Sequence, residues 1–213
     1  LVMIDEEGRN TIVDGDSSLE KLTVEEITEA LEAMRTARYF ITGFAMPEHL
    51  ALKAAQIAKS LGMITVLNPS PLPHSPMGDL DYIDYLVINE VEARVLAEVD
   101  EHAENYPEIA DLVKAKYHCG SIVMTLGEDG ALVFDNGEYH RLPAVKVKVV
   151  DTVGAGDSFL ASFVANLVWG KSVKEAAEYA IKCSALKVTR AGTIPAFPFR
   201  AEVEKFIEEL DQQ

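Results

Sequence analysis

The feature that most limits how this chain can fold is an alternation of short apolar runs with helical patterns between residues 39 and 126. Apolar runs bounded by polar or glycine-containing turns predict buried strands. They occupy residues 39–42, 63–67, 85–88 and 122–126, and helical spacing fills the segments 47–61, 90–99 and 107–117. Strands that alternate with helices build right-handed βαβ units, and hence a parallel sheet with helices on both faces. The sequence therefore predicts an α/β fold of three layers.

The two ends of the chain depart from this alternation. Residues 131–134 and 139–142, joined by an Asp-Asn-Gly-Glu turn, predict a hairpin that gives the sheet an antiparallel edge. Residues 2–4 and 11–13 predict another hairpin, which is too small to be stable alone. No repeat or linker interrupts the chain, so we expect residues 1–213 to form a single domain. Helical patterns cover the carboxy-terminal residues 156–169, 173–187 and 200–210.

The composition narrows the range of functions. The net charge of −16 argues against a broad nucleic-acid surface, although backbone N–H groups can still hold the phosphates of a nucleotide. No stretch approaches the roughly 20 apolar residues that span a bilayer. Cys119 and Cys183 lie far apart and form no metal-binding pattern, so reduced, buried thiols are expected. These features predict a cytoplasmic protein that binds neither nucleic acid nor membrane.

The segment 151–159 (DTVGAGDSF) follows an extended run and opens an apolar helix. Gly154 and Gly156 carry no side chain that would block an incoming phosphate. The N–H groups of residues 154–157 are the unsatisfied donors of a helix amino terminus, and they predict an anion hole for a transferred phosphoryl group. Asp157 lies in the first helical turn, where the helix dipole keeps it ionised and able to act as a base. The alternative is a turn that only starts a helix.

The string at 151–159 is similar to the second signature of the PfkB family of carbohydrate kinases, and the resemblance extends over essentially the whole chain. It implies a three-layer ribokinase-like fold with a mostly parallel sheet, an antiparallel edge hairpin and a lid. Asp157 would then be the catalytic base that activates the substrate hydroxyl. Gly154, Ala155 and Gly156 would form the anion hole.

Two further motifs resemble those of the family. N-x-x-E, at Asn89 and Glu92, implies residues that position Mg²⁺ and phosphate, partly through water, and oxygen ligands suit this hard ion. T-x-G-x-x-G, at Thr125 and Gly127, implies contacts along the phosphates of the nucleotide at the carboxyl end of a strand. Without the resemblance, the first motif would be polar residues at a helix start and the second a turn before a hairpin.

The loop near Gly192 resembles one that holds a monovalent cation, such as K⁺, in many family members. The resemblance implies that Asp151, the carbonyl of Val153 and the carbonyls of Arg190 and Gly192 are its ligands. Ala196 departs from the pattern, because many members carry a serine there. The resemblance at the cation site is therefore weaker than at the other motifs.

The amino-terminal third of the family fold has no counterpart in this sequence. That part supplies the first signature, a sugar-binding aspartate, further sheet strands and most of the lid. The chain also begins with Leu1 rather than methionine, so we expect that it is part of a longer protein. Residues 2–13 would then be the remaining part of the lid.

The resemblance implies a kinase that moves the γ-phosphoryl group of ATP to a hydroxymethyl group of a sugar, and that is a homodimer when intact. The alternatives are a nucleoside kinase of the same family and a truncated remnant that binds nucleotide without catalysis. Ala45 lies near the position of a sugar-binding glutamate in ribose-specific members. The loop 68–71 lacks the arginine typical of 2-keto-3-deoxygluconate kinases. The sequence thus names no sugar and leaves both ATP and ADP open as phosphoryl donors.

Overall fold

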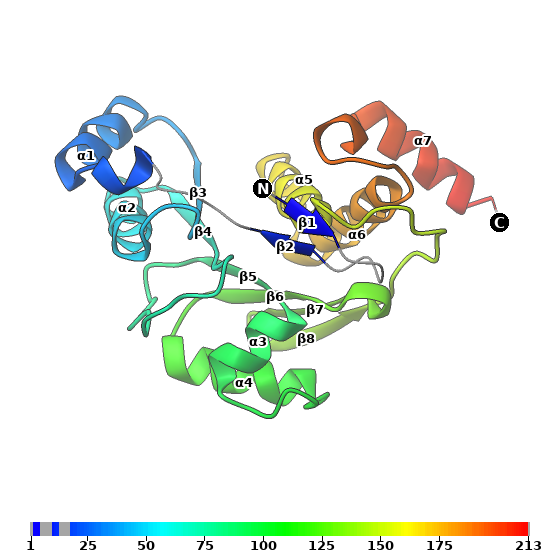
Figure 1. Ribbon diagram of the computed structural model, residues 1–213, viewed down its shortest axis with the longest axis horizontal. Helices are drawn as coiled ribbons and strands as arrows, with labels where there is room; N and C mark the ends of the chain where they lie inside the picture. Colours follow the sequence, from blue (N-terminus) through cyan, green and yellow to red (C-terminus); the bar gives the residue numbers. More distant parts are fainter. Residues whose placement is uncertain (1, 5–9, 13–17, 213) are drawn as a thin grey trace.

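The computed structural model describes residues 2–4, 10–12 and 18–212 (Figure 1). Its main sheet has six strands in the order β3-β4-β5-β6-β7-β8. The first four strands are parallel, and β7 and β8 complete the sheet as an antiparallel hairpin. The strands are β3 (Tyr39–Gly43), β4 (Ile64–Asn68), β5 (Tyr85–Asn89), β6 (Ser121–Thr125), β7 (Ala131–Asp135) and β8 (Glu138–Leu142). The predicted mixed sheet is confirmed, with each strand within one residue of its expected limits.

Helices cover both faces of this sheet. Figure 1 shows α3 and α4 on one side and α5 and α6 on the other. One core cluster joins the sheet to α2, α3 and α4, and another joins its opposite face to α5 and α6. The helices are α1 (Val24–Ala33), α2 (Glu48–Ser60), α3 (Glu90–Ala97), α4 (Tyr106–Tyr117), α5 (Ala155–Val168), α6 (Val173–Val188) and α7 (Arg200–Leu210). The predicted three-layer α/β fold is thereby confirmed.

The burial of the central strands explains the two-sided covering. On β5, Leu86 and Ile88 pack toward α3 and α4, whereas Val87 packs toward α5 and α6. The strand β6 repeats this alternation, because successive side chains of a strand point to opposite faces. An apolar run is therefore buried on both sides, as in other parallel sheets.

The helix α5 is fixed to the sheet by aromatic contacts. Phe163 is fully buried, stacks on Phe159 at 6.3 Å between ring centroids, and meets the ring of Tyr85 on β5 edge-on at 5.8 Å. Such pairs add to the stabilisation from buried area. The amino end of α5 is consequently held in a defined place above the sheet.

Shorter elements complete the described part of the chain. The predicted amino-terminal hairpin is present, as β1 (Val2–Ile4) and β2 (Asn10–Ile12) pair antiparallel in a separate two-stranded sheet. Its turn and Val13 lie outside the described residues. The 3₁₀ helices are η1 (Ser18–Lys21), η2 (Gly127–Asp129) and η3 (Ile194–Ala196). No helix in the described ranges is long and apolar enough to cross a membrane.

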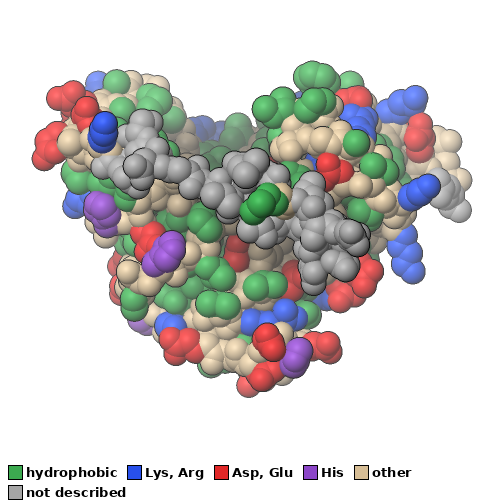
Figure 2. All heavy atoms as spheres, viewed as in Figure 1, with side chains coloured by type: hydrophobic (Ala, Val, Ile, Leu, Met, Phe, Trp, Pro, Cys, Tyr) green, Lys and Arg blue, Asp and Glu red, His purple; other side chains and the backbone are tan. Residues whose placement is uncertain are grey.

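The surface of the molecule has a hollow on the face shown in Figure 2. Figure 2 shows a hollow in its outline between the part formed by α1 and α2 and the part formed by α5, α6 and α7. Strand β3 forms the edge of the main sheet on the α1–α2 side.

Candidate active site

The carboxyl ends of the central strands bring two predicted site residues together. The strand β5 ends at Asn89 and β6 ends at Thr125, and the parallel register pairs these two residues directly. Ligands of open α/β sheets bind beyond the carboxyl ends of the strands. Asn89 and Thr125 thus lie where a ligand of this fold is expected.

Asn89 and Glu92 form a capping box that starts α3. The Glu92 N–H donates to Asn89 Oδ1 at 2.8 Å, and the Asn89 N–H donates to Glu92 Oε2 at 2.9 Å. Glu92 is only 5% exposed, and burial raises the pKa of its carboxyl although the Asn89 N–H acts in the opposite direction. The N-x-x-E pair therefore has a structural role whether or not it also positions a metal. No group of three or more His, Cys, Asp or Glu side chains in the described ranges could hold a metal ion.

The two glycines at the start of α5 differ in their surroundings. Gly154 has φ = 81°, and a Cβ there would lie 3.0 Å from the side chains of Thr193 and Phe197. A Cβ on Gly156, in contrast, would meet no protein atom within 4 Å. Gly154 is thus required by the fold, whereas the space beside Gly156 is open.

The predicted donors at this helix start differ in their availability. The Ala155 N–H donates to Thr152 O at 3.0 Å, so it is not a free donor as the sequence suggested. The N–H groups of Gly156 and Asp157 find no acceptor within the described part of the chain. These two groups remain available to an anion.

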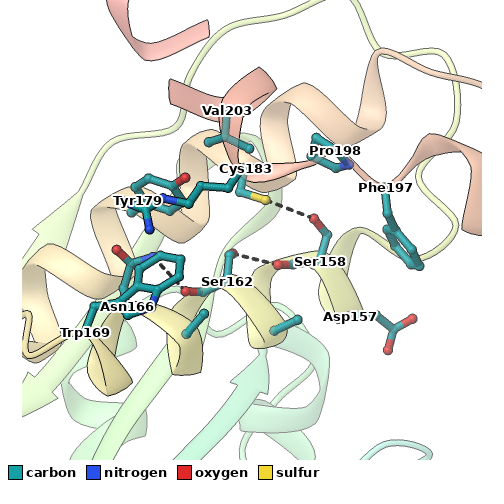
Figure 3. Close-up of a pocket in the computed structure, with 13 residues that line it drawn as sticks. Asp157, Ser158, Ser162, Asn166, Trp169, Tyr179, Cys183, Phe197, Pro198 and Val203 are labelled. Carbon is teal, nitrogen blue, oxygen red and sulfur yellow. Dashed lines mark hydrogen bonds between the residues drawn. The ribbon is translucent and has the colours of Figure 1, made fainter. Parts of the chain in front are cut away.

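Two cavities lie on either side of the α5 start. A cavity of about 1070 Å³ is lined by Asn89, Thr125, Gly127, Ala155 and Gly156, so it unites residues predicted from three separate motifs. Asp157, which is exposed, lies at the end of another cavity of about 390 Å³ between α5, α6 and α7 (Figure 3). Neighbouring residues at the amino end of α5 therefore line different cavities, Gly156 the larger one and Asp157 the smaller one.

The smaller cavity offers few free polar groups. Ser162 Oγ donates to Ser158 O at 2.7 Å, and Asn166 Nδ2 donates to Ser162 O at 2.8 Å (Figure 3). Ser158 Oγ contacts Cys183 Sγ at 3.4 Å. These groups are engaged with one another, whereas the buried hydroxyl of Tyr179, which also lines the cavity, has no hydrogen-bond partner among the described residues. Both predicted thiols are free and buried.

The residues predicted for a monovalent cation meet around Asp151. Its Oδ1 accepts the Val153 N–H at 2.9 Å, and its Oδ2 accepts the Gly192 N–H at 2.8 Å. These donors lower the pKa of the Asp151 carboxyl. Arg190 lies in the same loop, where its guanidinium pairs with Glu202 at 2.7 Å.

Lys187 is a residue of this site that the sequence analysis missed. It is fully buried, and its Nζ donates to the main-chain oxygen of Asp151 at 2.9 Å. The available signal was its spacing, since Lys187 follows the buried Ala180 and Cys183 on the inward face of α6. A lysine at helical spacing from buried residues indicates a charged group inside the protein.

The chain is similar in sequence to a known family of kinases. The sequence model of the pfkB family of carbohydrate kinases matches residues 1–200. Ribokinase from Schizosaccharomyces pombe is 30% identical over 208 residues, covering 96% of this chain and 65% of the relative. Ribokinase from Staphylococcus aureus is 29% identical over 207 residues, covering 96% and 67%. The chain thus spans about two thirds of the length of the curated relatives it matches.

Solved structures agree with the fold. The structure of Arabidopsis thaliana ribokinase complexed with ribose and ATP superposes with a TM-score of 0.85 at 29% identity, covering 97% of this chain and 68% of that one. Ribokinase from Giardia lamblia gives a TM-score of 0.86 at 20% identity, which shows the fold alone. That comparison covers 98% of this chain and 70% of the other.

Proposed function

This chain belongs to the pfkB family of carbohydrate kinases, and on that premise we propose that the protein transfers the γ-phosphoryl group of ATP to a hydroxymethyl group of a sugar. The observation that carries the proposal is the position of the α5 start. Gly156 lines the cavity that Thr125 and Gly127 also line, and the next residue is Asp157, whose carboxylate is exposed. Phosphoryl transfer needs donor and acceptor on opposite sides of an anion-stabilising group.

The larger cavity is the proposed nucleotide site. Thr125 and Gly127 would lie along the phosphates of the nucleotide, and the Gly156 N–H would donate to the transferred group. ATP is bound in the related A. thaliana structure, which supports ATP as the co-substrate. Since the cavity collects these residues at the carboxyl ends of the strands, the nucleotide would bind where open α/β folds bind their ligands.

The same cavity fits Mg²⁺. It presents the oxygen-bearing side chains of Asn89, Glu90 and Thr125, the type of donor that this ion prefers. Mg²⁺ usually takes few protein ligands and keeps several waters, which suits the absence of a carboxylate cluster among the described residues. Bound with ATP, it would neutralise charge on the phosphates. Glu92, being buried, would act through water or by holding Asn89 in place.

Asp157 is the proposed base. It would accept the proton of the substrate hydroxyl, while the N–H groups of Gly156 and Asp157 stabilise charge on the phosphoryl group. The attacking hydroxyl loses its proton late in a loose transition state, so the position of the carboxylate matters more than a raised pKa.

Ribose is the proposed first substrate, because the named relatives include ribokinases at about 30% identity and the A. thaliana structure contains ribose. A nucleoside is the second candidate. Its support is weaker, since the nucleoside kinase from Burkholderia thailandensis bound to inosine is only 19% identical. We also propose that residues 1–213 form one domain whose β1–β2 hairpin belongs to a lid, and that the intact protein is a homodimer.

Calorimetric titration of this polypeptide with Mg-ATP and Mg-ADP, paired with a coupled assay on ribose, deoxyribose and inosine, tests the proposal. We expect weak nucleotide binding and inefficient sugar phosphorylation, because the lid strands and sugar-binding residues of the family lie outside this sequence. Robust turnover would contradict the need for those segments. If no nucleotide bound, the nucleotide site proposed here would be wrong.

A further inference from the structure

Lys187 places a positive charge inside the protein. Its side chain has no exposed surface, although the residue lies in the last turn of α6. An unpaired buried ammonium is costly, so such groups are normally paired with acceptors. The acceptor here is the main-chain oxygen of Asp151 at 2.9 Å. The negative end of the α6 dipole also favours a cation at this position.

Asp151 has no oxygen left without a partner. Its carboxylate oxygens accept the N–H groups of Val153 and Gly192, and its carbonyl accepts the Lys187 ammonium. The two chain segments that would surround a monovalent cation are therefore already joined by bonds within the protein. Ala196, which is 1% exposed, adds no side-chain oxygen to this site.

The Lys187 ammonium lies against the main chain of Asp151 and adds positive charge near its carboxylate. A potassium ion next to Asp151 would add a further positive charge close to this buried ammonium, and like charges repel. A positive charge of the protein itself is therefore already present beside the residues that the loop resemblance implied for a monovalent cation.

We propose that the Lys187 ammonium replaces this cation, so that the protein orders the loops at Asp151 and Gly192 without K⁺. This inference depends on the proposed nucleotide site only in the test that measures nucleotide binding. The ammonium joins α6 to the segment that leads into α5, and the Asp151 carboxylate joins that segment to the loop before α7. Because the Lys187 ammonium is part of the protein, it would keep the segment that leads into α5 in place at any salt composition.

The unmodified polypeptide provides the first test. Its thermal unfolding midpoint and its Kd for Mg-ATP are measured in KCl and in tetramethylammonium chloride of equal ionic strength. We expect the same midpoint in both salts and a Kd that differs by less than about twofold. A Kd at least about tenfold tighter in KCl, or a midpoint higher by about 2–4 °C or more, would overturn the proposal. The unfolding measurement needs no nucleotide, so it stands even if the proposed nucleotide site fails.

The second test removes the ammonium. Lys187→Met keeps the length of the side chain, and Lys182→Met on the same helix, at a half-buried position, is the matched control. In tetramethylammonium chloride we expect Lys187→Met to have a lower unfolding midpoint than the unmodified chain, and in KCl to recover part of this loss. The unfolding midpoint of the control should be the same in both salts. If Lys187→Met had the same unfolding midpoint in both salts, the role of Lys187 would be packing alone and the proposal would be wrong. If Lys187→Met does not fold, the salt comparison on the unmodified chain still decides the question.

Discussion

Asp157 is exposed and lies in the first turn of α5, at the positive end of the helix dipole. We expect Asp157→Asn in the complete protein to lower kcat by about 10²–10⁴ while the affinity for nucleotide changes little. Steady-state kinetics and calorimetry would measure the two effects separately. Asp211→Asn, an exposed aspartate after α7, is the control. A normal kcat with only a changed KM would assign Asp157 a structural role.

Gly154 and Gly156 are two residues apart but differ in what a methyl group would do. At Gly154 the backbone has a positive φ, and an added Cβ would lie too close to Phe197 and Thr193. We therefore expect Gly154→Ala to destabilise the protein by about 1–2 kcal/mol or more. At Gly156 the methyl enters open space, and alanine favours a helix by up to about 1 kcal/mol.

We therefore expect Gly156→Ala to unfold no more easily than the original chain, yet to bind Mg-ATP more weakly because the methyl occupies the phosphate side of the cavity. Chemical denaturation and calorimetry on both variants would show the contrast. Unimpaired binding by Gly156→Ala would remove Gly156 from the anion hole.

The sequence predicted the residues of the α5 start because their chemistry is local. A glycine pair and an aspartate at a helix start define free N–H groups without any knowledge of tertiary contacts. It did not predict Lys187, since a lysine with a long apolar stem can leave a helix toward solvent or toward the interior. Nor did it distinguish a metal motif from a capping box at Asn89 and Glu92, because both functions use the same spacing.

At the scale of elements, boundaries were predictable wherever an apolar run was bounded by turn residues or a cap. Thr23 and Glu26 have the Thr-x-x-Glu spacing of a capping box, and they form one at the start of α1. The helical pattern was predicted from residue 47, but Pro47 is the N-cap of α2 and the helix begins at Glu48. Proline is suited to the start of a helix by its fixed φ, which does not distinguish these two adjacent positions.

The start of α6 provides an energetic test at this scale. Ser172 and Glu175 form a capping box, and the Glu175 pKa is lowered because its carboxylate accepts hydrogen bonds from the Ser172 N–H and hydroxyl. We expect Ser172→Ala to reduce the free energy of unfolding by about 1 kcal/mol.

Glu175→Ala should also be destabilising, in a way that depends on pH. A carboxyl whose pKa is lower in the folded state stabilises the protein above the unfolded pKa of about 4.3, and this contribution is lost as the pH falls further. Urea denaturation at pH 7 and near pH 4 would show a smaller difference from the original chain at the lower pH. Glu208→Ala, on the exposed face of α7, is the control. A difference that stayed constant would mean that the glutamate acts through its apolar stem.

At the scale of the whole molecule, the two edges of the main sheet differ in kind. The strand β8 carries Glu138, His140 and Arg141, and charged residues on an edge discourage pairing with other chains. The strand β3 (YFITG) has no charge, and its Ile41 is 43% exposed. The composition of β3 is thus typical of a strand with a neighbour on both sides.

This difference predicts that the polypeptide as given associates with itself through β3. Sedimentation at increasing concentration should reveal oligomers, and Ile41→Lys should shift them toward monomer. Leu112→Lys, at an exposed apolar position on α4, should leave the association unchanged. Equal effects of the two substitutions would indicate general apolar attraction rather than strand pairing.

The alternation of strands and helices made the three layers predictable, because each βαβ unit has one favourable hand. The relation between the amino-terminal hairpin and the main sheet was not predictable in the same way. Pairing between segments far apart in a sequence depends on contacts that no local pattern encodes. The identity of the sugar was not predictable either, because it depends on which side chains the fold gathers around Asp157.

The capping box at Asn89 and Glu92 and the open space at Gly156 would evolve differently in a lineage that lost the kinase activity. Selection for folding alone would retain Asn89 and Glu92, because they start α3. Gly156 would be free to drift toward alanine, which the helix prefers and which meets no protein atom. An intact N-x-x-E pair is therefore poor evidence that a homologue is a working enzyme, and the residue aligned with Gly156 is the more informative marker.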